Sequence, residues 1–305
     1  MRKPVTVLEN SELTAPCGRG SVGNGSATRV RGKRFLVRLS AGIFCLAGAW
    51  AAYTQTPQAG PKLTLEKVKD DLYVIANDGG NVAAYVTDEG VIIVDDKFDA
   101  DVAEILAKIK SVTDKPVKYV LNTHQHGDHT GGNQKLLPLA EIIIHQNARA
   151  NMVAGKMPGV PRITYSDQTG VYLGGKEVLA KHFGRGHTNG DAAIYFPALK
   201  LVHTGDLFVN GAPFLVYASG ASAKEWTTTI DGILKWDFDT VIPGHGPVSK
   251  RADLIKFRDN FAKMRDRVSG MVREGKSQDD VMKTLVADFG WGTRPIDGLI
   301  AELKQ

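Results

Sequence analysis

The chain has 305 residues, of which 43% are hydrophobic and 23% are charged. This composition is ordinary for a globular protein and excludes a disordered chain, a collagen or a coiled coil as the whole-chain description. The net charge of +5 arises in residues 1–60, which hold eight Lys and Arg against two acids, whereas residues 61–305 (the body) hold 30 against 31. Because the body lacks excess positive charge to neutralise phosphates, we expect no nucleic-acid partner.

Residues 1–60 form a basic leader. A basic run at 29–38 precedes fifteen mostly apolar residues at 39–53, which end in small residues, and a polar linker follows. This pattern predicts a signal peptide and an exported, periplasmic or secreted protein. An uncleaved membrane anchor through residues 39–53 is the alternative, although the run is short for a span. Both cysteines, Cys17 and Cys45, lie in the leader, so the body has no thiolate ligand and no disulfide.

The first half of the body is predicted to begin with four short strands and a helix. β-type runs at 63–68, 72–76, 82–87 and 91–95 are separated by turn residues that suit hairpins. Apolar residues then repeat at helical spacing, at Phe98, Val102, Ile105, Leu106 and Ile109. A strand at 117–121 and a loop rich in His and Asp follow.

The second half is predicted to hold a second group of strands followed by helices. Further strands are predicted at 141–144, 178–183, 192–196, 199–203 and 240–242. Ser222 and Glu225 form a capping box that opens one helix. An apolar stripe from Leu254 to Met271 predicts another helix, Ser277 and Asp280 cap a third, and residues 151–162 are expected to form a loop near the site. Strands in two groups, each followed by helices, suggest two facing sheets, but any α/β or α+β layering remains compatible.

The densest group of metal-ligand residues is Thr123-His124-Gln125-His126-Gly127-Asp128-His129, directly after the predicted strand 117–121. Imidazole and carboxylate are preferred ligands of Zn²⁺. His124 and His126 are expected to converge on one ion, with Asp128 and His129 pointing towards a second.

Three more residues of the same kind lie in glycine-rich turns at strand ends. They are His187 after Gly186, Asp206 after Gly205, and His245 between Gly244 and Gly246. Glycine lets the backbone turn tightly enough for the neighbouring side chain to face a shared centre. Each turn alone is a weak signal, but together with the 124–129 segment they predict a metal site.

The H-x-H-x-D-H segment and these turns resemble the metallo-β-lactamase superfamily over residues 63–250. The resemblance implies an α+β fold, a four-layer αββα sandwich, with a dinuclear metal site at one edge. It also implies a hydrolase domain at 61–250, with C-terminal helices at 251–305 packed on it. By motif, the first metal would be held by His124, His126 and His187, the second by Asp128, His129 and His245, and Asp206 would bridge them.

Two departures leave the substrate open. Asp206 stands where two classes of β-lactamase have Cys, and in this it resembles glyoxalase II, the lactonases and the phosphodiesterases. Residues 186–191 nevertheless resemble lactamase-like sequences. The turn at 78–81 is shorter than the mobile substrate-covering loop of some lactamases.

We therefore expect a dinuclear zinc hydrolase that opens a cyclic amide or ester, a β-lactam or a lactone. Two Zn²⁺ would hold a shared water as hydroxide, which attacks the carbonyl while Asp128 orients it and accepts its proton. The alternatives are a thioesterase of glyoxalase II type and an iron oxidoreductase similar to persulfide dioxygenases. In each case the partner is a small-molecule substrate, and the oligomeric state stays open.

The sequence leaves two roles open for several residues around the predicted site. Asp95 either orients a ligand histidine or ends a strand, and Thr123 and Thr188 are lesser candidates for the orienting role. Phe208, Phe214 and Tyr217 either wall the substrate pocket or pack in the core. The remaining histidines of the body, His145, His182 and His203, are expected to be structural.

Overall fold

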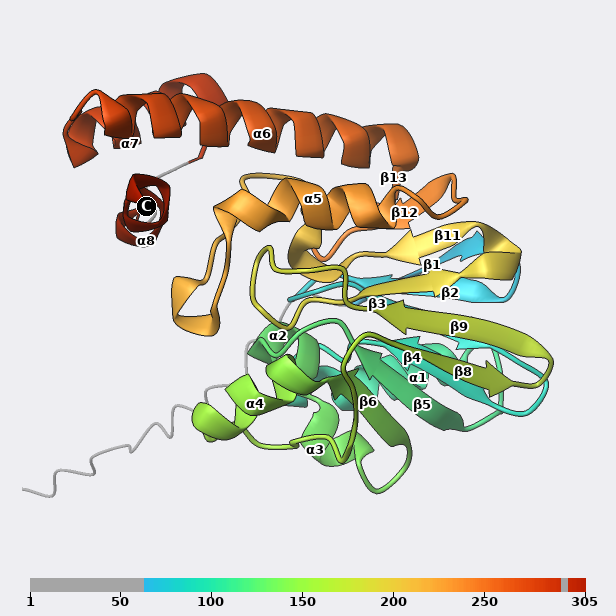
Figure 1. Cartoon of the computed structure of the whole chain (residues 1–305). Helices are drawn as coiled ribbons and strands as arrows, with labels where there is room; N and C mark the ends of the chain where they lie inside the picture. Colours follow the sequence, from blue (N-terminus) through green and yellow to red (C-terminus); the bar gives the residue numbers. More distant parts are fainter. Residues whose placement is uncertain (1–62, 292–295) are drawn as a thin grey trace, which may run out of the picture. The chain divides into compact units, whose positions relative to one another are not determined.

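The computed structural model describes residues 63–291 and 296–305, so the predicted leader, with its apolar run, lies outside the described residues. The body contains two sheets (Figure 1). The first has seven strands in sequence order: β1 (Thr64–Lys69), β2 (Leu72–Ala76), β3 (Val82–Val86), β4 (Val91–Val94), β5 (Val117–Asn122), β6 (Glu141–His145) and β7 (Ile163–Tyr165). Strands β1–β4 pair antiparallel and β4–β7 pair parallel.

The second sheet has six strands: β8 (Gln168–Leu173), β9 (Lys176–Lys181), β10 (Ala193–Phe196), β11 (Leu201–His203), β12 (Thr240–Ile242) and β13 (Ser249–Lys250). Only the β11–β12 pair is parallel. The helices are α1 (Val102–Lys110), α2 (Gly127–Thr130), α3 (Asn133–Leu136), α4 (Gln146–Ala154), α5 (Ala223–Ile233), α6 (Arg251–Arg273), α7 (Gln278–Phe289) and α8 (Asp297–Lys304).

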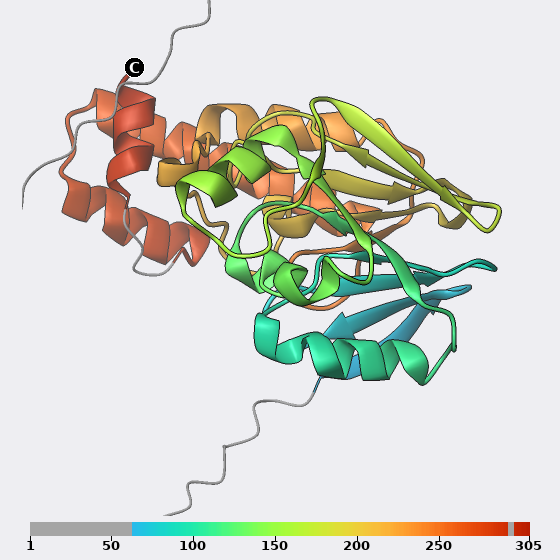
Figure 2. The ribbon, with the colours of Figure 1, turned by 90° about the horizontal axis from the view of Figure 1, so that it is seen from below.

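Three apolar cores separate four layers. Along β4, Val91 and Ile93 pack with α1, whereas Ile92 and Val94 pack between the two sheets. On the second sheet, Ile194 faces the first sheet and Ala193 faces the α5 and α6 side. Because both faces of these strands are buried, their sequences are continuous apolar runs. Figure 2 shows α1 on the outer side of the first sheet. The predicted four-layer αββα sandwich is confirmed.

Two of the C-terminal helices, α6 and α8, pack on α5. Helix α6 contacts α5, and α8 contacts both α5 and α6. Leu299 and Leu303 of α8 join the core that also contains Trp226 of α5. None of the helices among the described residues is long and apolar enough to cross a membrane.

Some predicted elements need correction. The expected helix begins at Val102, after a 3-10 turn at Asp99–Asp101, and Phe98 is 41% exposed instead of lying on its buried face. The expected strand 199–203 begins only at Leu201, because a 3-10 turn occupies Pro197–Leu199. Residues 151–154 of the expected loop belong to α4. Strands β7, β8 and β13 and helices α2, α3 and α4 were not predicted from the sequence.

Candidate metal centre

The H-x-H-x-D-H segment runs from the end of β5 into α2. The predicted loop is wrong in its second half, where Gly127–Thr130 forms one helical turn with His126 as its N-cap residue. The amide of His129 donates to the His126 carbonyl at 3.0 Å. This turn separates the directions of the side chains, so that His124 and His126 face one centre while Asp128 and His129 face another.

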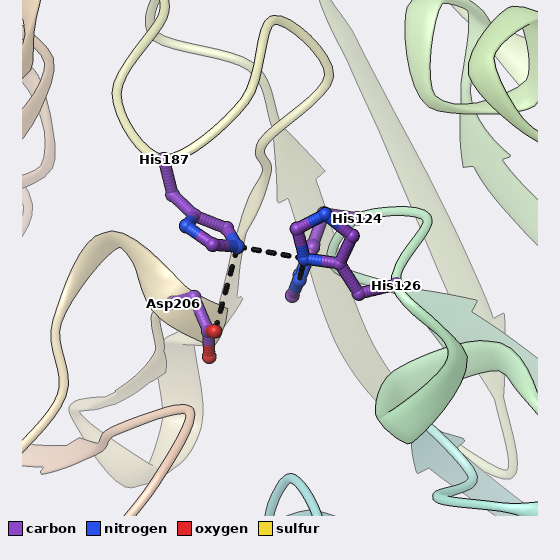
Figure 3. Close-up of side chains that lie close together, drawn as sticks. All are labelled: His124, His126, His187 and Asp206. Atoms are coloured by element: carbon purple, nitrogen blue, oxygen red, sulfur yellow. Dashed lines mark hydrogen bonds and ion pairs between the residues drawn. The ribbon is translucent and has the colours of Figure 1, made fainter. Parts of the chain in front are cut away.

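The first group of converging side chains is His124, His126, His187 and Asp206 (Figure 3). His126 Nδ1 lies 3.1 Å from His124 Nε2 and 2.8 Å from His187 Nε2, and His187 Nε2 lies 3.5 Å from Asp206 Oδ2. A tetrahedral ion with bonds of about 2.0–2.1 Å separates its ligands by about 3.3 Å. The donor spacing of the first group therefore fits one zinc-sized cation.

The second group is Asp128, His129 and His245. His245 Nε2 lies 3.2 Å from Asp128 Oδ2 and 3.4 Å from His129 Nε2. Asp206 faces this group as well, because its Oδ1 lies 3.3 Å from His129 Nε2 and 3.4 Å from His245 Nε2. This buried oxygen has no hydrogen bond among the described residues. An unsatisfied carboxylate oxygen between two ligand groups fits a cation.

Glycines let the separate turns meet at the site. A Cβ on Gly244 would lie 2.0 Å from Asp206 Oδ1, so only glycine lets the His245 turn approach that carboxylate. Gly205, which precedes Asp206, has φ of +50°, and its Cβ would lie 2.5 Å from Thr123 Oγ1. The glycine-rich turns noted in the sequence are thus required by this close packing.

Buried Asp95 supports a histidine in each group. It accepts from His129 Nδ1 at 2.7 Å, and from the Thr123 amide and hydroxyl at 2.8 Å each. Since the Thr123 hydroxyl donates to Asp95, it accepts from His124 Nδ1 at 3.1 Å. Both histidines are thereby held with Nε2 towards the site. His187 is held in the same way, because its Nδ1 donates to the Phe214 carbonyl.

The charges of the site also suit cations. Burial lowers the pKa of His126 to about 4 and that of His124 well below its usual value, so both rings are neutral ligands. Burial alone would lower the pKa of His129, but the Asp206 and Asp95 carboxylates outweigh it and raise that pKa. The Asp128 and Asp206 carboxylates beside its Nε2 raise the pKa of His245 to about 9. The histidines in turn outweigh burial and lower the pKa of Asp128 and Asp206, so these two carboxylates are ionised and favour nearby positive charge.

Two residues that support the site, Asn81 and Lys97, were not predicted from the sequence. Asn81, treated there only as a turn residue, donates its side-chain amide to the Pro243 and Gly246 carbonyls at 2.9 and 2.8 Å, fixing the His245 turn. Lys97 is fully buried, and its ammonium donates to the Asn77 and Gly80 carbonyls. A lysine directly after two acids is typical of a solvated turn. The two hydrogen bonds of Lys97 to the 77–80 turn are therefore visible only in the fold.

The other three histidines lie outside both groups. His145 and His182 stack with ring centroids 4.1 Å apart. His203 Nε2 donates to the Asn81 carbonyl at 3.0 Å, and its Nδ1 accepts from the Gly205 amide at 3.1 Å. His203 therefore supports the turn that carries Asp206, which agrees with its expected structural role.

A pocket of about 810 Å³ opens over both groups. Beyond the ligand-type residues and Asn210 and Gly211, its described lining is Val209, Ala212, Phe214 and Val216, with no Lys or Arg. Phe214 therefore lines the pocket, as one of the two expectations had it. Phe208 is instead buried in the core beside α5. Tyr217 is not among the described lining residues, and its hydroxyl donates to Glu302 at 2.7 Å.

The chain belongs to the metallo-beta-lactamase superfamily, whose sequence model matches residues 76–245. It is a hydrolase of that superfamily with a His/Asp metal-binding cluster. It is 28% identical over 178 residues to the type 2 metallo-beta-lactamase of Bacillus cereus, covering 57% of this chain and 69% of that one. It is also 29% identical over 161 residues to the hydroxyacylglutathione hydrolase of Nostoc punctiforme, covering 50% of this chain and 53% of the relative.

Solved structures show the same fold. A metallo-beta-lactamase from Pontibacter korlensis superposes with a TM-score of 0.61 at 22% identity, covering 66% of this chain and 99% of that chain. The FIM-1 enzyme from Pseudomonas aeruginosa, in its mono-zinc form, gives a TM-score of 0.59 at 18% identity, covering 67% and 96%. These matches confirm the predicted fold.

Proposed function

We propose that this hydrolase is a dinuclear zinc enzyme that opens an uncharged cyclic ester or amide, a lactone or a β-lactam. The observation that carries the proposal is the convergence of seven donors in two groups that share Asp206. His124, His126 and His187 would hold one ion, Asp128, His129 and His245 the other, with Asp206 between them. When bound, such ions supply Lewis acidity and make a water nucleophilic at neutral pH.

Asp128 is the proposed proton acceptor. Burial would raise its pKa, but its hydrogen bond with His245 and the charge on His129 outweigh burial and lower it. The carboxylate is therefore ionised, and it lines the pocket where a substrate would lie. From this position it can orient the attacking water and accept its proton.

The pocket wall supports an uncharged substrate. Val209, Phe214 and Val216 offer apolar surface to a ring, and no Lys or Arg of the described lining is placed to pair with a substrate carboxylate. A glutathione thioester or a carboxylated β-lactam would lack that partner. Similarity to a hydroxyacylglutathione hydrolase makes a thioester the second candidate.

The test is metal analysis combined with three hydrolysis assays on the zinc-loaded protein and on a chelator-treated control. An uncharged aryl-substituted lactone should be opened faster than a chromogenic cephalosporin or an S-acyl thioester. Two zinc ions per chain with preferred lactone turnover would support the proposal. Preference for the thioester would move the function to the second candidate. Iron in the isolated protein with no hydrolysis of any of the three substrates would overturn it.

We also propose that the enzyme acts outside the cytoplasm. Only the basic and apolar leader supports this. Fractionation of cells that express the full chain, with a tag at the C-terminus, tests it. Recovery of the protein solely in the cytoplasm, at full length, would contradict export.

A further inference from the structure

Helix α8 lies more than 50 residues beyond the segment that matches the family, yet it contacts the 3-10 turn at Tyr217–Ser219 and the N-terminus of α5. Its Glu302 carboxylate accepts from the Tyr217 hydroxyl at 2.7 Å, the Ser222 hydroxyl at 2.6 Å and the Ala223 amide at 2.8 Å. Ser222 is the N-cap residue of α5, so Glu302 completes the cap of that helix. A carboxylate at a helix N-terminus is favoured by the unpaired amides and the helix dipole.

A second contact fixes α8 against the same tyrosine. Gly298 precedes Glu302 by one helical turn, on the same face of α8. A Cβ on Gly298 would lie 2.3 Å from Tyr217 Cδ2 and 2.5 Å from Tyr217 Cγ. The ring of Tyr217 is thus packed directly against the α8 backbone while its hydroxyl is bound by Glu302. Burial and the Glu302 carboxylate together raise the pKa of Tyr217, so the hydroxyl remains a donor.

Tyr217 lies in the middle of a segment that holds His187. The Phe214 carbonyl accepts from His187 Nδ1, and the Val216 amide donates to the His187 carbonyl at 3.0 Å. Further along, the Asn189 amide donates to the Ser219 carbonyl at 2.9 Å, and the Ser222 amide donates to the Gly186 carbonyl at 3.0 Å. Residues 214–222 therefore run beside 186–189 and are tied to them on both sides of Tyr217.

We propose that Glu302 is a positioning residue of the metal centre, which acts through Tyr217 and residues 214–222 to fix the orientation of His187 and the Phe214 wall of the pocket. The inference rests on the proposed function in one respect, the assignment of His187 as a ligand. Under this proposal, helix α8 supports the metal centre in addition to packing on α5 and α6.

The experiment compares Glu302→Ala with Leu299→Ala in the full chain. Leu299 is buried on α8 in the core shared with α5 and α6 and is not bonded to Tyr217, so its loss reduces stability without breaking the contact. We expect Glu302→Ala to lower the affinity for the ion held by His187 by about 10- to 100-fold, as loss of support for a ligand does elsewhere. The visible spectrum of the cobalt-loaded protein should change and KM should rise. Leu299→Ala should lower Tm but leave metal affinity, spectrum and KM unchanged.

Two further variants cover a failure of Glu302→Ala to fold. Glu302→Gln keeps one acceptor oxygen and should restore most of the affinity, while Tyr217→Phe removes only the hydroxyl and should weaken it partly. Equal changes at the site in Glu302→Ala and Leu299→Ala, for equal loss of Tm, would overturn the proposal. So would an unchanged cobalt spectrum in both Glu302→Ala and Tyr217→Phe.

A last readout separates this proposal from the proposed function. Hydrogen exchange of the Val216 and Asn189 amides, measured without added metal, should quicken in Glu302→Ala and not in Leu299→Ala. If the wild-type protein hydrolyses none of the substrates, this measurement and metal affinity still decide the role of Glu302. Unchanged exchange at both amides would contradict it whatever the activity.

Discussion

The two groups of ligand-type residues differ in how firmly the fold holds them. In the first group, His124 and His187 are buried, and each has its outer nitrogen fixed, by Thr123 and by the Phe214 carbonyl. In the second group, His129 is equally buried and fixed by Asp95, but the side chain of His245 is 37% exposed. Among the described residues, the Nδ1 atom of His245 has no hydrogen-bond partner. Its Nε2 atom lies beside other ligand-type residues, Asp128, Asp206 and His129.

This difference indicates a division of roles. A ligand set that is already held in place loses little entropy when an ion binds, so the first group should retain its ion more tightly. Both groups border the pocket, but the side chains of His245 and Asp128 in the second group are 37% and 27% exposed, whereas those of His187 and Asp206 are 1% and 12% exposed. An exposed, less constrained group leaves room for a substrate and a water. We therefore expect the first group to retain its ion more tightly, and the second group to be the one that gives access to a substrate and a water.

Removal of the shared carboxylate should have the largest effect. Asp206→Ala deprives both groups of a donor and leaves His129 without one of the charges that raise its pKa. We expect metal content to fall below one ion per chain and kcat/KM to fall by about 10⁴-fold or more, equal to about 5–6 kcal/mol. Metal analysis and steady-state kinetics measure this. Asp237→Ala, on an exposed carboxylate, is the control. A variant that keeps two ions would refute the shared role.

Replacement of Asp128 tests the open group alone. Asp128→Ala should reduce kcat by about 10²- to 10⁴-fold, the usual contribution of a positioned base. The ion of the first group should be retained, because Asp128 does not belong to that set. Turnover close to wild type with both ions bound would show that another group accepts the proton.

The site could be predicted because its signals are local in sequence. Four of the seven ligand-type residues lie within six positions after β5, and each of the other three adjoins a glycine. A Cβ on Gly205 or Gly244 would collide with Thr123 or Asp206. Strands that are buried on both faces, such as β4, could also be predicted, because both faces take apolar residues and the sequence is a continuous apolar run. At these positions the local sequence preference and the tertiary environment favour the same residues.

The other features of the site and fold could not be predicted, because they depend on contacts with residues far away in the chain. Asn81 bonds to carbonyls more than 160 residues later, and Glu302 bonds to residues about 80 positions earlier. Strand β8 has alternate exposed residues and an internal glycine, so its pattern is weak until it pairs with β9. Helix α2 begins with glycine and is one turn long, which local propensity disfavours. Tertiary contacts decide each of these.

Asp95 offers a smaller and more selective change, because it reaches the two groups by different routes. Asp95→Asn should weaken metal binding by about 10- to 100-fold, since it disturbs His129 directly and His124 through Thr123. Thr123→Val removes only the hydroxyl and should weaken the first group alone. Stepwise metal titration followed by calorimetry distinguishes them. Equal effects of the two variants on both ions would show that the groups are not supported independently.

The smallest effect concerns a buried histidine outside both groups. Burial, followed by the charge on His182, lowers the pKa of His145 to about 4 from a usual value near 6.5. The unfolded chain therefore takes up a proton first as pH falls, and the folded state loses stability from about pH 6.5 down to about pH 4. Full linkage would give about 3 kcal/mol, which solvent screening near the partly exposed His182 reduces to about 1–2 kcal/mol.

The variant His145→Gln tests this pH dependence of stability. It also tests whether His145 is only a buried imidazole or a ligand of the metal centre. The Gln amide can still donate to the Ser166 carbonyl, which His145 Nε2 contacts at 3.0 Å. The variant should be less stable than wild type at pH 8, and the difference should shrink by about 1–2 kcal/mol at pH 4.5 in urea unfolding. Zinc should stabilise both proteins by the same amount at pH 8, because His145 Nε2 faces a carbonyl and not a shared centre. A variant that lost zinc stabilisation would mean that the boundary of the metal centre extends to this pair of rings.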